Sequence, residues 1–313
     1  MEMPKRNCRR RPALAACVVL GLNALFPLGD AISIFGNAGF FQQGLFEAFS
    51  SQRKIKRCIM LRKETLCQSV ARGEPVRRFV FQAPEMVNIS TGLRQVVVVL
   101  GPGPGALPIP RMYSPTSEPR SDGTFDLVVR VYRQGQVSRW LDSLKPGDSV
   151  SMMWPHPSPL PADRRNPGRR VGLIAFGIGI TELYRTAVQE LADPNVKEVV
   201  LLYATRTMEE QQVLQPEIQA LAKKESRFRL DRILSQESHP DCRHGRVDSS
   251  VLEEVFPWSQ DANLRAEARF VSAGSQEMMK HAHDLLAALG YDPRSYKLIR
   301  DASLSSVFQL FAR

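Results

Sequence analysis

The residues with the clearest chemical potential in this chain are Arg111, Tyr113 and Ser114, in the run Arg-Met-Tyr-Ser-Pro-Thr-Ser. A flavin nucleotide needs a cation near its pyrophosphate, a flat aromatic side chain against its rings and a small hydroxyl or backbone donor at its redox-active nitrogen. Alternate residues of a strand face the same way, so this spacing can supply the three groups in order. Ser-Pro-Thr-Ser is also an ordinary turn sequence, and the motif alone leaves both interpretations open.

A second motif places Gly135 and Ser138 before an amphipathic stretch that ends at Gly147. A glycine and a serine at a helix start leave backbone N–H groups that can hold a phosphate. Simple helix capping explains the same residues equally well.

Two further glycine motifs each follow an apolar run and open a helical pattern. Gly177, Gly179 and Thr181 lie in Gly-Ile-Gly-Ile-Thr, and Gly274 lies in Ala-Gly-Ser-Gln-Glu-Met. Glycines at a strand-to-helix junction let a dinucleotide approach the backbone, and Gly274 could abut a nicotinamide. Neither motif is a complete Gly-x-Gly-x-x-Gly, and a plain strand-to-helix turn remains the alternative for each.

The elements that must position these motifs fall into two domains. Residues 53–155 contain short β-like runs separated by turn residues, which predict a small antiparallel barrel. The predicted strands are 76–82, 95–100, 125–132 and 149–154.

After a Pro/Arg-rich linker at 156–170, residues 171–301 alternate strands with helices. This pattern predicts a doubly wound parallel α/β sheet, which binds its ligands at the carboxyl ends of the strands. Predicted strands are 171–176, 198–204, 228–234 and 269–273; predicted helices are 181–192, one ending near 223, one near 251 and 276–289. Residues 302–313 are assigned to a C-terminal tail.

Residues 1–52 are interpreted as a leader, because a basic start precedes an apolar run from about 13 to 28. A cleaved signal peptide, a retained signal-anchor and a buried helix all remain open. The stretch from 40 to 57 adds an organelle transit segment or an amphipathic surface helix as alternatives. Membrane association at the endoplasmic reticulum or an organelle envelope, or targeting to an organelle, is therefore expected, with the compartment undecided.

Composition excludes several classes of protein. The net charge of +10 suits a solvated surface, or docking of an acidic partner or a phosphate, but aromatics do not interleave with the basic runs as nucleic-acid binding would require. The five cysteines show no disulfide framework or zinc spacing. His281 and His283 do not share a helix face, so we expect them on the surface and predict no metal site.

The order and spacing of the four motifs resemble the ferredoxin-reductase superfamily, in its cytochrome-b5 reductase branch, from about residue 54 to 300. The resemblance implies that Arg111, Tyr113, Ser114, Gly135 and Ser138 bind FAD. It also implies that the basic residue Arg130 contacts FAD or the nicotinamide nucleotide, and that Gly177, Gly179, Thr181 and Gly274 approach NADH or NADPH.

The sequence departs from this family near the expected hydride-transfer site. Glu182 replaces the usual proline after Gly-Ile-Thr, and Ala273 replaces a cysteine that many members place beside the nicotinamide. The linker is also shorter than the family loop that covers the adenine end of FAD. The run Leu234-Ser235-Gln236 stands at the strand end where an acid would bind the ribose of NADH; it lacks that acid and could suit a 2′-phosphate helped by a nearby arginine. Asp231 is close in sequence, so the choice between NADH and NADPH stays open, and only the overall resemblance slightly favours NADH.

The resemblance implies an FAD-dependent oxidoreductase that passes a hydride from NAD(P)H to FAD and single electrons to a haem or iron–sulfur protein, such as an acidic cytochrome b5. No acid–base catalytic residue is required. The alternative is an interaction or assembly subunit that keeps the fold but has lost NAD(P)H turnover, as the departures at positions 182 and 273 would allow.

Overall fold

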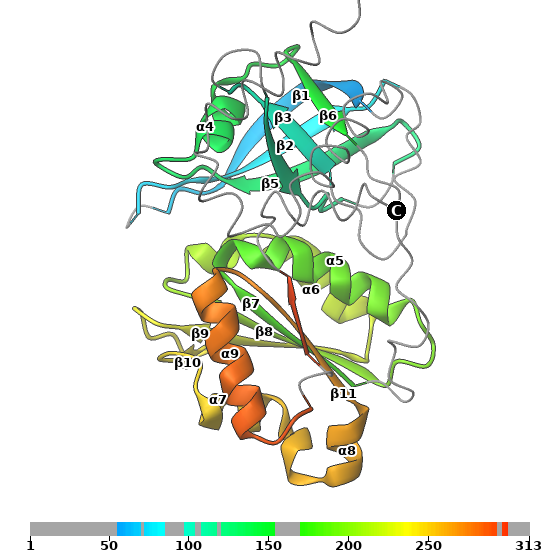
Figure 1. Cartoon of the computed structure of the whole chain (residues 1–313), viewed down its shortest axis with the longest axis vertical. Coiled ribbons are helices and arrows are strands. Elements are labelled where there is room, and N and C mark those ends of the chain that lie inside the picture. The colour runs from blue at the N-terminus through cyan, green and yellow to red at the C-terminus, as the bar shows by residue number, and fades with distance from the viewer. Residues whose placement is uncertain are drawn as a thin grey trace, which may run out of the picture.

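The chain forms two bodies stacked along its long axis (Figure 1). The computed structural model describes residues 55–69, 72–84, 97–103, 108–117, 120–153, 170–292 and 296–299. The predicted leader and tail lie outside these residues, as does all of the Pro/Arg-rich linker except Arg170. The two sheets confirm the predicted order of an antiparallel β domain followed by a parallel α/β domain.

The first body is a six-stranded antiparallel sheet in the order β4-β3-β6-β1-β2-β5. Its strands are β1 (Ile55–Cys67), β2 (Val76–Gln82), β3 (Val97–Gly101), β4 (Ile109–Tyr113), β5 (Thr124–Arg130) and β6 (Ser149–Met153). Its two outer strands meet where Pro115, just past β4, forms an isolated bridge with Leu127 of β5. The sheet therefore closes on itself as a barrel.

The barrel interior is filled by aromatic and branched side chains. Phe79, Phe81 and Phe125 are fully buried, and Phe81 stacks on Phe125 with ring centroids 5.8 Å apart. Helix α4 (Gln136–Ser143) buries Val137 and Leu141 in the same core. This packing holds the amino terminus of α4 at a fixed place on the barrel.

The second body is a six-stranded parallel sheet in the order β10-β9-β8-β7-β11-β12. Its strands are β7 (Arg170–Phe176), β8 (Glu198–Thr205), β9 (Phe228–Leu234), β10 (Arg243–His244), β11 (Ala268–Ala273) and β12 (Tyr296–Ile299). The chain runs outward from β7 through β8, β9 and β10, then returns to the other side of β7 as β11. The strand order reverses at β7. In sheets of this kind, ligands bind beyond the carboxyl ends of the strands at the point of reversal.

Helices cover both faces of this sheet. They are α5 (Ile180–Leu191), α6 (Gln215–Lys224), α7 (Ser249–Val255), α8 (Ala262–Glu267) and α9 (Gln276–Ala288), with short 3-10 turns η3 (Gly177–Gly179), η4 (Glu210–Gln212) and η5 (Pro257–Gln260). Leu173 packs with α5 and α6, and Ile174, pointing the other way, packs with α7 and α9. Successive strand residues point to opposite faces, and both faces of β7 are covered, so β7 is apolar from Val171 to Phe176.

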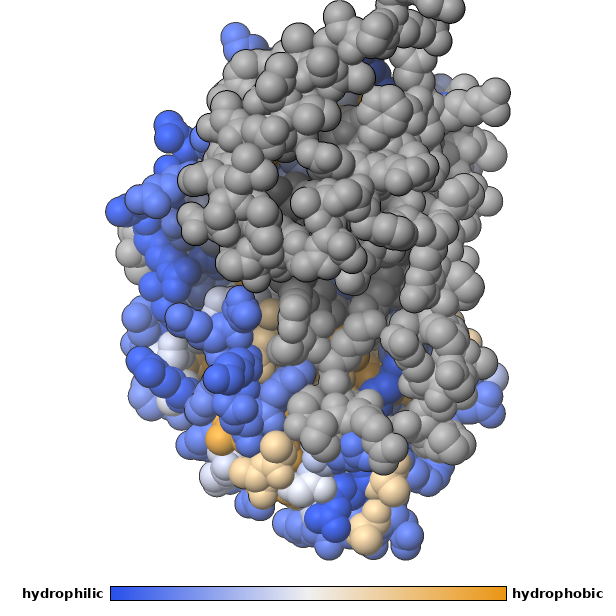
Figure 2. Space-filling view, in the orientation of Figure 1, coloured by the Kyte–Doolittle hydropathy of each residue, from blue (hydrophilic) through white to orange (hydrophobic). Residues whose placement is uncertain are grey.

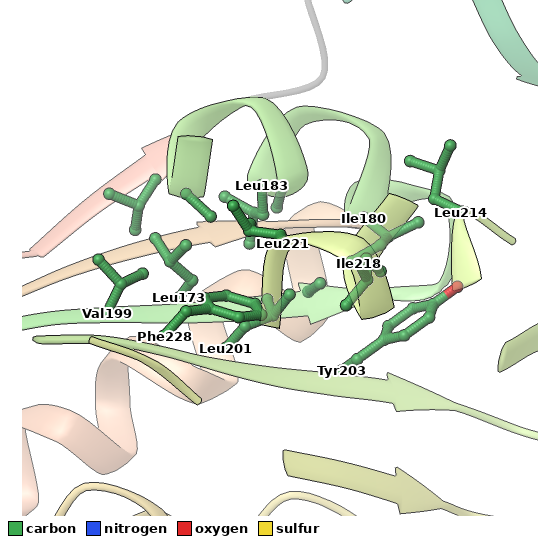
Figure 3. Packing of buried hydrophobic residues seen from close by; sticks show 14 of the residues in the cluster. Leu173, Ile180, Leu183, Val199, Leu201, Tyr203, Leu214, Ile218, Leu221 and Phe228 are labelled. Carbon is green, nitrogen blue, oxygen red and sulfur yellow. The ribbon is translucent and has the colours of Figure 1, made fainter. Parts of the chain in front are cut away.

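The core beneath α5 and α6 reaches the barrel. It joins Leu183, Tyr203 and Leu221 (Figure 3) to the barrel residues Cys67 and Val128. In Figure 1, α5 lies along the side of the sheet nearer the barrel. The two domains therefore share buried apolar contacts as well as the polar contacts described below.

Most predicted elements match the structure within two residues, and the strands predicted at 76–82 and 228–234 match β2 and β9. The long strand β1, the short strands β10 and β12 and helix α8 were not predicted. One prediction was wrong: His283 is buried, with its Nε2 2.9 Å from Ser272 Oγ, whereas His281 is exposed as expected. Ser272 gives the imidazole a polar partner inside the sheet, which offsets the cost of its burial.

The surface of the described residues is mostly hydrophilic in the view of Figure 2, with only scattered hydrophobic residues on the nucleotide domain. Within the described ranges, no helix is both long enough and apolar enough to cross a membrane. Cys58, Cys67 and Cys242, the three cysteines in those ranges, are free thiols.

Candidate active site

Motifs that are far apart in sequence meet where the barrel faces the carboxyl edge of the parallel sheet. Ser114 follows β4 of the barrel, Gly177 follows β7, and Gly274 follows β11. Strands β7 and β11 are hydrogen-bonded neighbours, with Ala273 paired to Ala175. Gly179 packs against Ala273 and Gly274, so the two glycine loops meet at this edge of the sheet.

The contact that joins these motifs across the domains is a hydrogen bond between two side chains. The Ser114 hydroxyl donates to the Glu182 carboxylate, across 68 residues of sequence. Both residues are half-buried, and Glu182 lies in the first turn of α5. The residue that departs from the family pattern thus touches the residue predicted to face the flavin ring.

The glycines of the nucleotide loops allow very close packing between β7 and β11. A Cβ atom on Gly179 would lie 2.2 Å from the Ala273 carbonyl oxygen. Gly274 has φ +152°, and a Cβ there would lie 2.6 Å from Phe176 Cβ. Any side chain at either position would push the two strand ends apart, so glycine is required by the packing itself.

Thr181 is half-buried, and its hydroxyl donates to the Ile178 carbonyl oxygen at 3.0 Å. The hydroxyl therefore stabilises the turn that carries Gly177 and Gly179. The Ile180 N–H donates to the carbonyl oxygens of Gly177 and Ile178. Neither η3 nor α5 has a side-chain cap, so the N–H groups at the start of η3 have no capping side chain and can bind an anionic ligand.

The amino terminus of α4 offers a comparable site on the barrel. Gly135 is its N-cap and provides no side-chain cap bond. Ser138, which is buried, instead accepts a hydrogen bond from Tyr132 N at 3.2 Å and donates to the Gly135 carbonyl oxygen at 3.3 Å. These bonds fix the turn and leave the first backbone N–H groups of the helix without a partner from a capping side chain.

The remaining residues of the first motif lie on β4. Arg111 is exposed, and its guanidinium donates to the Pro110 carbonyl oxygen at 2.8 Å. Tyr113 is half-buried and packs against the barrel core. Arg111 and Tyr113 alternate along the strand as predicted, with Ser114 directly after it.

Arg130 lies in a buried charged cluster between the domains. Its Nη1 is 3.1 Å from a carboxylate oxygen of Glu210, and each of these side chains is only 5% exposed. The Arg206 guanidinium lies 3.6 Å from the same carboxylate, and the Arg206 backbone N–H donates to it at 3.2 Å. Burial alone raises the pKa of Glu210, but the charges and hydrogen bonds of Arg130 and Arg206 outweigh burial and lower it.

Other polar contacts across the same interface surround this cluster. Glu209 accepts hydrogen bonds from the backbone N–H groups of Gln68 and Ser69 at 2.9 and 3.0 Å. Arg78 of β2 pairs with Glu217 of α6. The family resemblance implied that Arg130 contacts FAD or the nicotinamide nucleotide, and in the structure its guanidinium pairs with Glu210 in this interdomain network.

The edge where a coenzyme ribose would lie is formed by the ends of β8, β9 and β10. Ser235 directly follows β9, and its backbone N–H donates to the Thr205 carbonyl oxygen at 3.0 Å. Asp231 lies inside β9, where its carboxylate pairs with Arg229 and with Arg243. Because Asp231 does not reach the strand end, Ser235 is the residue at the predicted ribose position.

These observations fit FAD and a nicotinamide dinucleotide. Two helix starts without side-chain caps suit the two pyrophosphates, and the glycines at the junction of β7 and β11 keep side chains out of the turn before α5. At the flavin ring the fit has one particular feature: Ser114 gives its proton to Glu182, so its oxygen is left as an acceptor.

The sequence prediction missed Glu210, which organises the domain interface. Its only local signal is the spacing of four residues from Arg206, and such pairs are common on exposed helices. Phe176, which packs against Gly274, was predicted only as the end of a strand.

Two family models match the chain in the order of its domains. An oxidoreductase FAD-binding domain matches residues 61–158, and an oxidoreductase NAD-binding domain matches residues 173–284. The first range contains the barrel motifs and the second contains both nucleotide loops.

Similar proteins agree with these matches. NADH-cytochrome b5 reductase 1 of Mycosarcoma maydis is 32% identical over 207 residues, covering 63% of this chain and 60% of that protein. The protein of the same name in Cryptococcus neoformans is 29% identical over 198 residues, covering 61% of this chain and 66% of that protein. The aligned part of the chain thus spans less than two thirds of the length of these relatives.

Solved structures share the fold. The cytochrome b5 reductase domain of Ulva prolifera nitrate reductase has a TM-score of 0.61 at 22% identity, covering 79% of this chain and 98% of that one. A ferredoxin NADP⁺ reductase from Neisseria gonorrhoeae has a TM-score of 0.58 at 19% identity, covering 78% of this chain and 98% of that one. With an oxidoreductase FAD-binding domain followed by an oxidoreductase NAD-binding domain, which together match most of its length, the chain belongs to the two-domain FAD- and NAD-binding oxidoreductases and is similar to NADH-cytochrome b5 reductases.

Proposed function

We propose that this protein is an NAD(P)H-dependent flavin oxidoreductase that delivers single electrons to a protein acceptor. The observation that carries the proposal is the hydrogen bond from Ser114, at the end of β4, to Glu182, in the first turn of the helix that follows the Gly177 to Gly179 turn. This contact between the barrel and the start of α5 supports a flavin ring and a nicotinamide that meet at the domain junction, as direct hydride transfer requires.

In this proposal the chain acts by binding and orientation. The α4 start and Arg111 hold the FAD pyrophosphate, Tyr113 packs against the flavin rings, and the Gly177 to Gly179 turn holds the coenzyme pyrophosphate. Bound FAD supplies the conversion between two-electron and one-electron transfer. The buried Arg130–Glu210 pair keeps the two halves of the site at a fixed separation.

An anaerobic titration of the whole chain tests this function. The purified protein is expected to be yellow, or to become yellow with added FAD, and to bleach when NADH or NADPH is added without oxygen. A yellow protein that stays oxidised with both coenzymes would contradict NAD(P)H turnover and support the assembly-subunit alternative. A protein that binds no FAD would contradict the flavin role itself.

We propose further that the enzyme accepts NADPH as well as NADH. An acid at the end of β9 would bind the ribose hydroxyls of NADH and repel a 2′-phosphate. The uncharged Ser235 binds the hydroxyls more weakly and does not repel the phosphate. The nearby Glu237 carboxylate accepts the Met208 N–H at 2.6 Å, which holds it toward the loop after β8. The exposed Arg246, just after β10, adds positive charge near this edge.

Substituting Ser235→Asp is therefore expected to lower kcat/KM for NADPH at least about tenfold relative to NADH, equivalent to about 1.4 kcal/mol. The reason is the repulsion between the new carboxylate and a 2′-phosphate. Steady-state kinetics with both coenzymes measures the ratio. Ser226→Asp, an exposed change before the start of the same strand, is the matched control and should leave the ratio unchanged. An unchanged ratio in Ser235→Asp would place the ribose elsewhere.

The electron acceptor is proposed to be an acidic haem or iron–sulfur protein. The chain's net charge of +10 and the basic cluster at 53–57 support electrostatic docking. With an acidic cytochrome b5 as acceptor, the rate constant should fall steeply as ionic strength rises, while bleaching by NAD(P)H should change little. A salt-independent rate would contradict this type of docking.

Membrane association through residues 1–52 is likewise our proposal, supported by the basic start and apolar run in the sequence. Fusing this segment to a fluorescent protein and fractionating cells would test it. Recovery of the fusion with membranes or an organelle is the expected result, and a uniformly distributed fusion would contradict it.

A further inference from the structure

We propose that Glu182 is a positioning residue of the flavin-ring site, which holds the Ser114 hydroxyl proton and makes bound FAD a weaker oxidant than it would be without this carboxylate. The inference rests on the proposed function, because it assumes that Ser114 faces the ring. It concerns a residue at which this chain departs from the proline of its family.

The first step of the argument is the position of the carboxylate. Glu182 projects from the first turn of α5 to the Ser114 hydroxyl at the end of β4, so it lies between the nucleotide turn and the barrel. Both residues are half-buried. A charge in such a place is less screened than one in bulk water, and it acts more strongly on a neighbouring group.

The second step concerns the Ser114 hydroxyl, which has a single proton. Because that proton is donated to Glu182, the oxygen can only accept a hydrogen bond from the flavin ring. An unprotonated ring nitrogen of oxidised FAD therefore gains no donor from Ser114.

The third step compares two opposing effects on flavin reduction. Reduction adds negative charge to the ring, and the Glu182 carboxylate opposes that change. The Ser114 oxygen, as an acceptor, would favour a ring N–H that forms on reduction. A full charge at close range outweighs one neutral hydrogen bond, so the net effect of Glu182 is a lower midpoint potential.

The direction of the side chain also explains how a carboxylate is tolerated at this helix start. The amino terminus of α5 is expected to hold the coenzyme pyrophosphate, and an acid pointing at that anion would weaken binding. Because Glu182 is bonded to Ser114 instead, its charge is directed to the flavin side of the turn.

The test is the midpoint potential of FAD bound to the full chain, measured by equilibration with redox dyes. Glu182→Gln is expected to raise the ratio of reduced to oxidised flavin at a fixed potential by about tenfold, or about 30 mV for a two-electron couple. Glu182→Asp keeps the charge and should stay closer to the wild-type potential. Glu253→Gln, an exposed change on α7, is the charge-matched control and should leave the potential unchanged.

The outcomes separate this inference from the proposed function. If the wild-type chain binds no FAD, or its FAD is not reduced by either coenzyme, the proposed function has failed. If wild-type FAD is bound and reduced but Glu182→Gln shifts the potential no more than Glu253→Gln does, the role of Glu182 is wrong. An equal shift in Glu182→Asp and Glu182→Gln would overturn the assignment of the effect to charge.

Discussion

Replacing Glu210 by glutamine is expected to lower the free energy of unfolding by about 3 to 5 kcal/mol, because the substitution leaves Arg130 as a buried, uncompensated charge. Both side chains are 5% exposed, and Arg206 lies 3.6 Å from the same carboxylate. Urea denaturation followed by circular dichroism measures the loss, provided the transition slope is unchanged.

The matched control is Glu217→Gln, which breaks another ion pair between the same two domains. Glu217 and its partner Arg78 are 27% and 19% exposed. Water screens such a pair more effectively, so the loss should be below about 1 kcal/mol. If Glu210→Gln costs no more than this control, the buried cluster does not hold the domains together.

The same cluster predicts how the difference between wild type and Glu210→Gln varies with pH. Despite the opposing effect of burial, the pKa of Glu210 is below its ordinary value of 4.5. A carboxyl with a lowered folded-state pKa contributes stability above its unfolded pKa and loses it as pH falls through the folded value. The free energies of unfolding of the two proteins should therefore differ by the full amount above about pH 5 and become equal in acid.

Gly179→Ala is expected to slow reduction of bound FAD by NAD(P)H by about 100-fold, while FAD itself stays bound. The added Cβ would lie 2.2 Å from the Ala273 carbonyl oxygen, so the ends of β7 and β11 must separate. Such a shift moves the nicotinamide away from the flavin, whereas the barrel is untouched. Anaerobic stopped-flow spectroscopy at the flavin absorbance measures the rate.

Gly147→Ala provides the contrasting control for that experiment. Nothing lies within 4 Å of a Cβ at Gly147, but its φ of +96° is strained for alanine. This change should cost about 1 kcal/mol of stability and leave the reduction rate unaltered. If NAD(P)H reduces the FAD of the Gly179→Ala protein at the wild-type rate, the turn does not position the coenzyme.

The strands of the parallel sheet could be predicted because they are buried on both faces. Strand β7 has a continuous apolar run from Val171 to Phe176 that needs no partner to be recognised. Strand β1 was harder to predict from sequence, because it begins in a basic cluster and alternates buried residues with the exposed Ile59 and Leu61. Its 13 residues are held by pairing with β2 and β6, and that support comes from distant sequence.

The motif residues could also be found in sequence, but the contacts between domains could not. Ser114 and Glu182 are 68 residues apart, and Arg130 and Glu210 are 80 apart. A local pattern records which face of an element is buried, but it carries no information about the angle between two domains. The burial of His283 was missed for a different reason: its partner Ser272 lies on β11, and the sequence pattern did not show that α9 turns His283 toward that strand.

The order of strands has a consequence for synthesis of the protein on the ribosome. Pairing of β1 with β6 completes the barrel sheet within residues 55–153, so every predicted FAD-binding residue of the first domain has left the ribosome while much of the chain is still untranslated. The nucleotide turn at Gly179 obtains its packing partner only when Ala273 has been made. A nascent chain can therefore offer a site for FAD well before it can offer one for the coenzyme that reduces it.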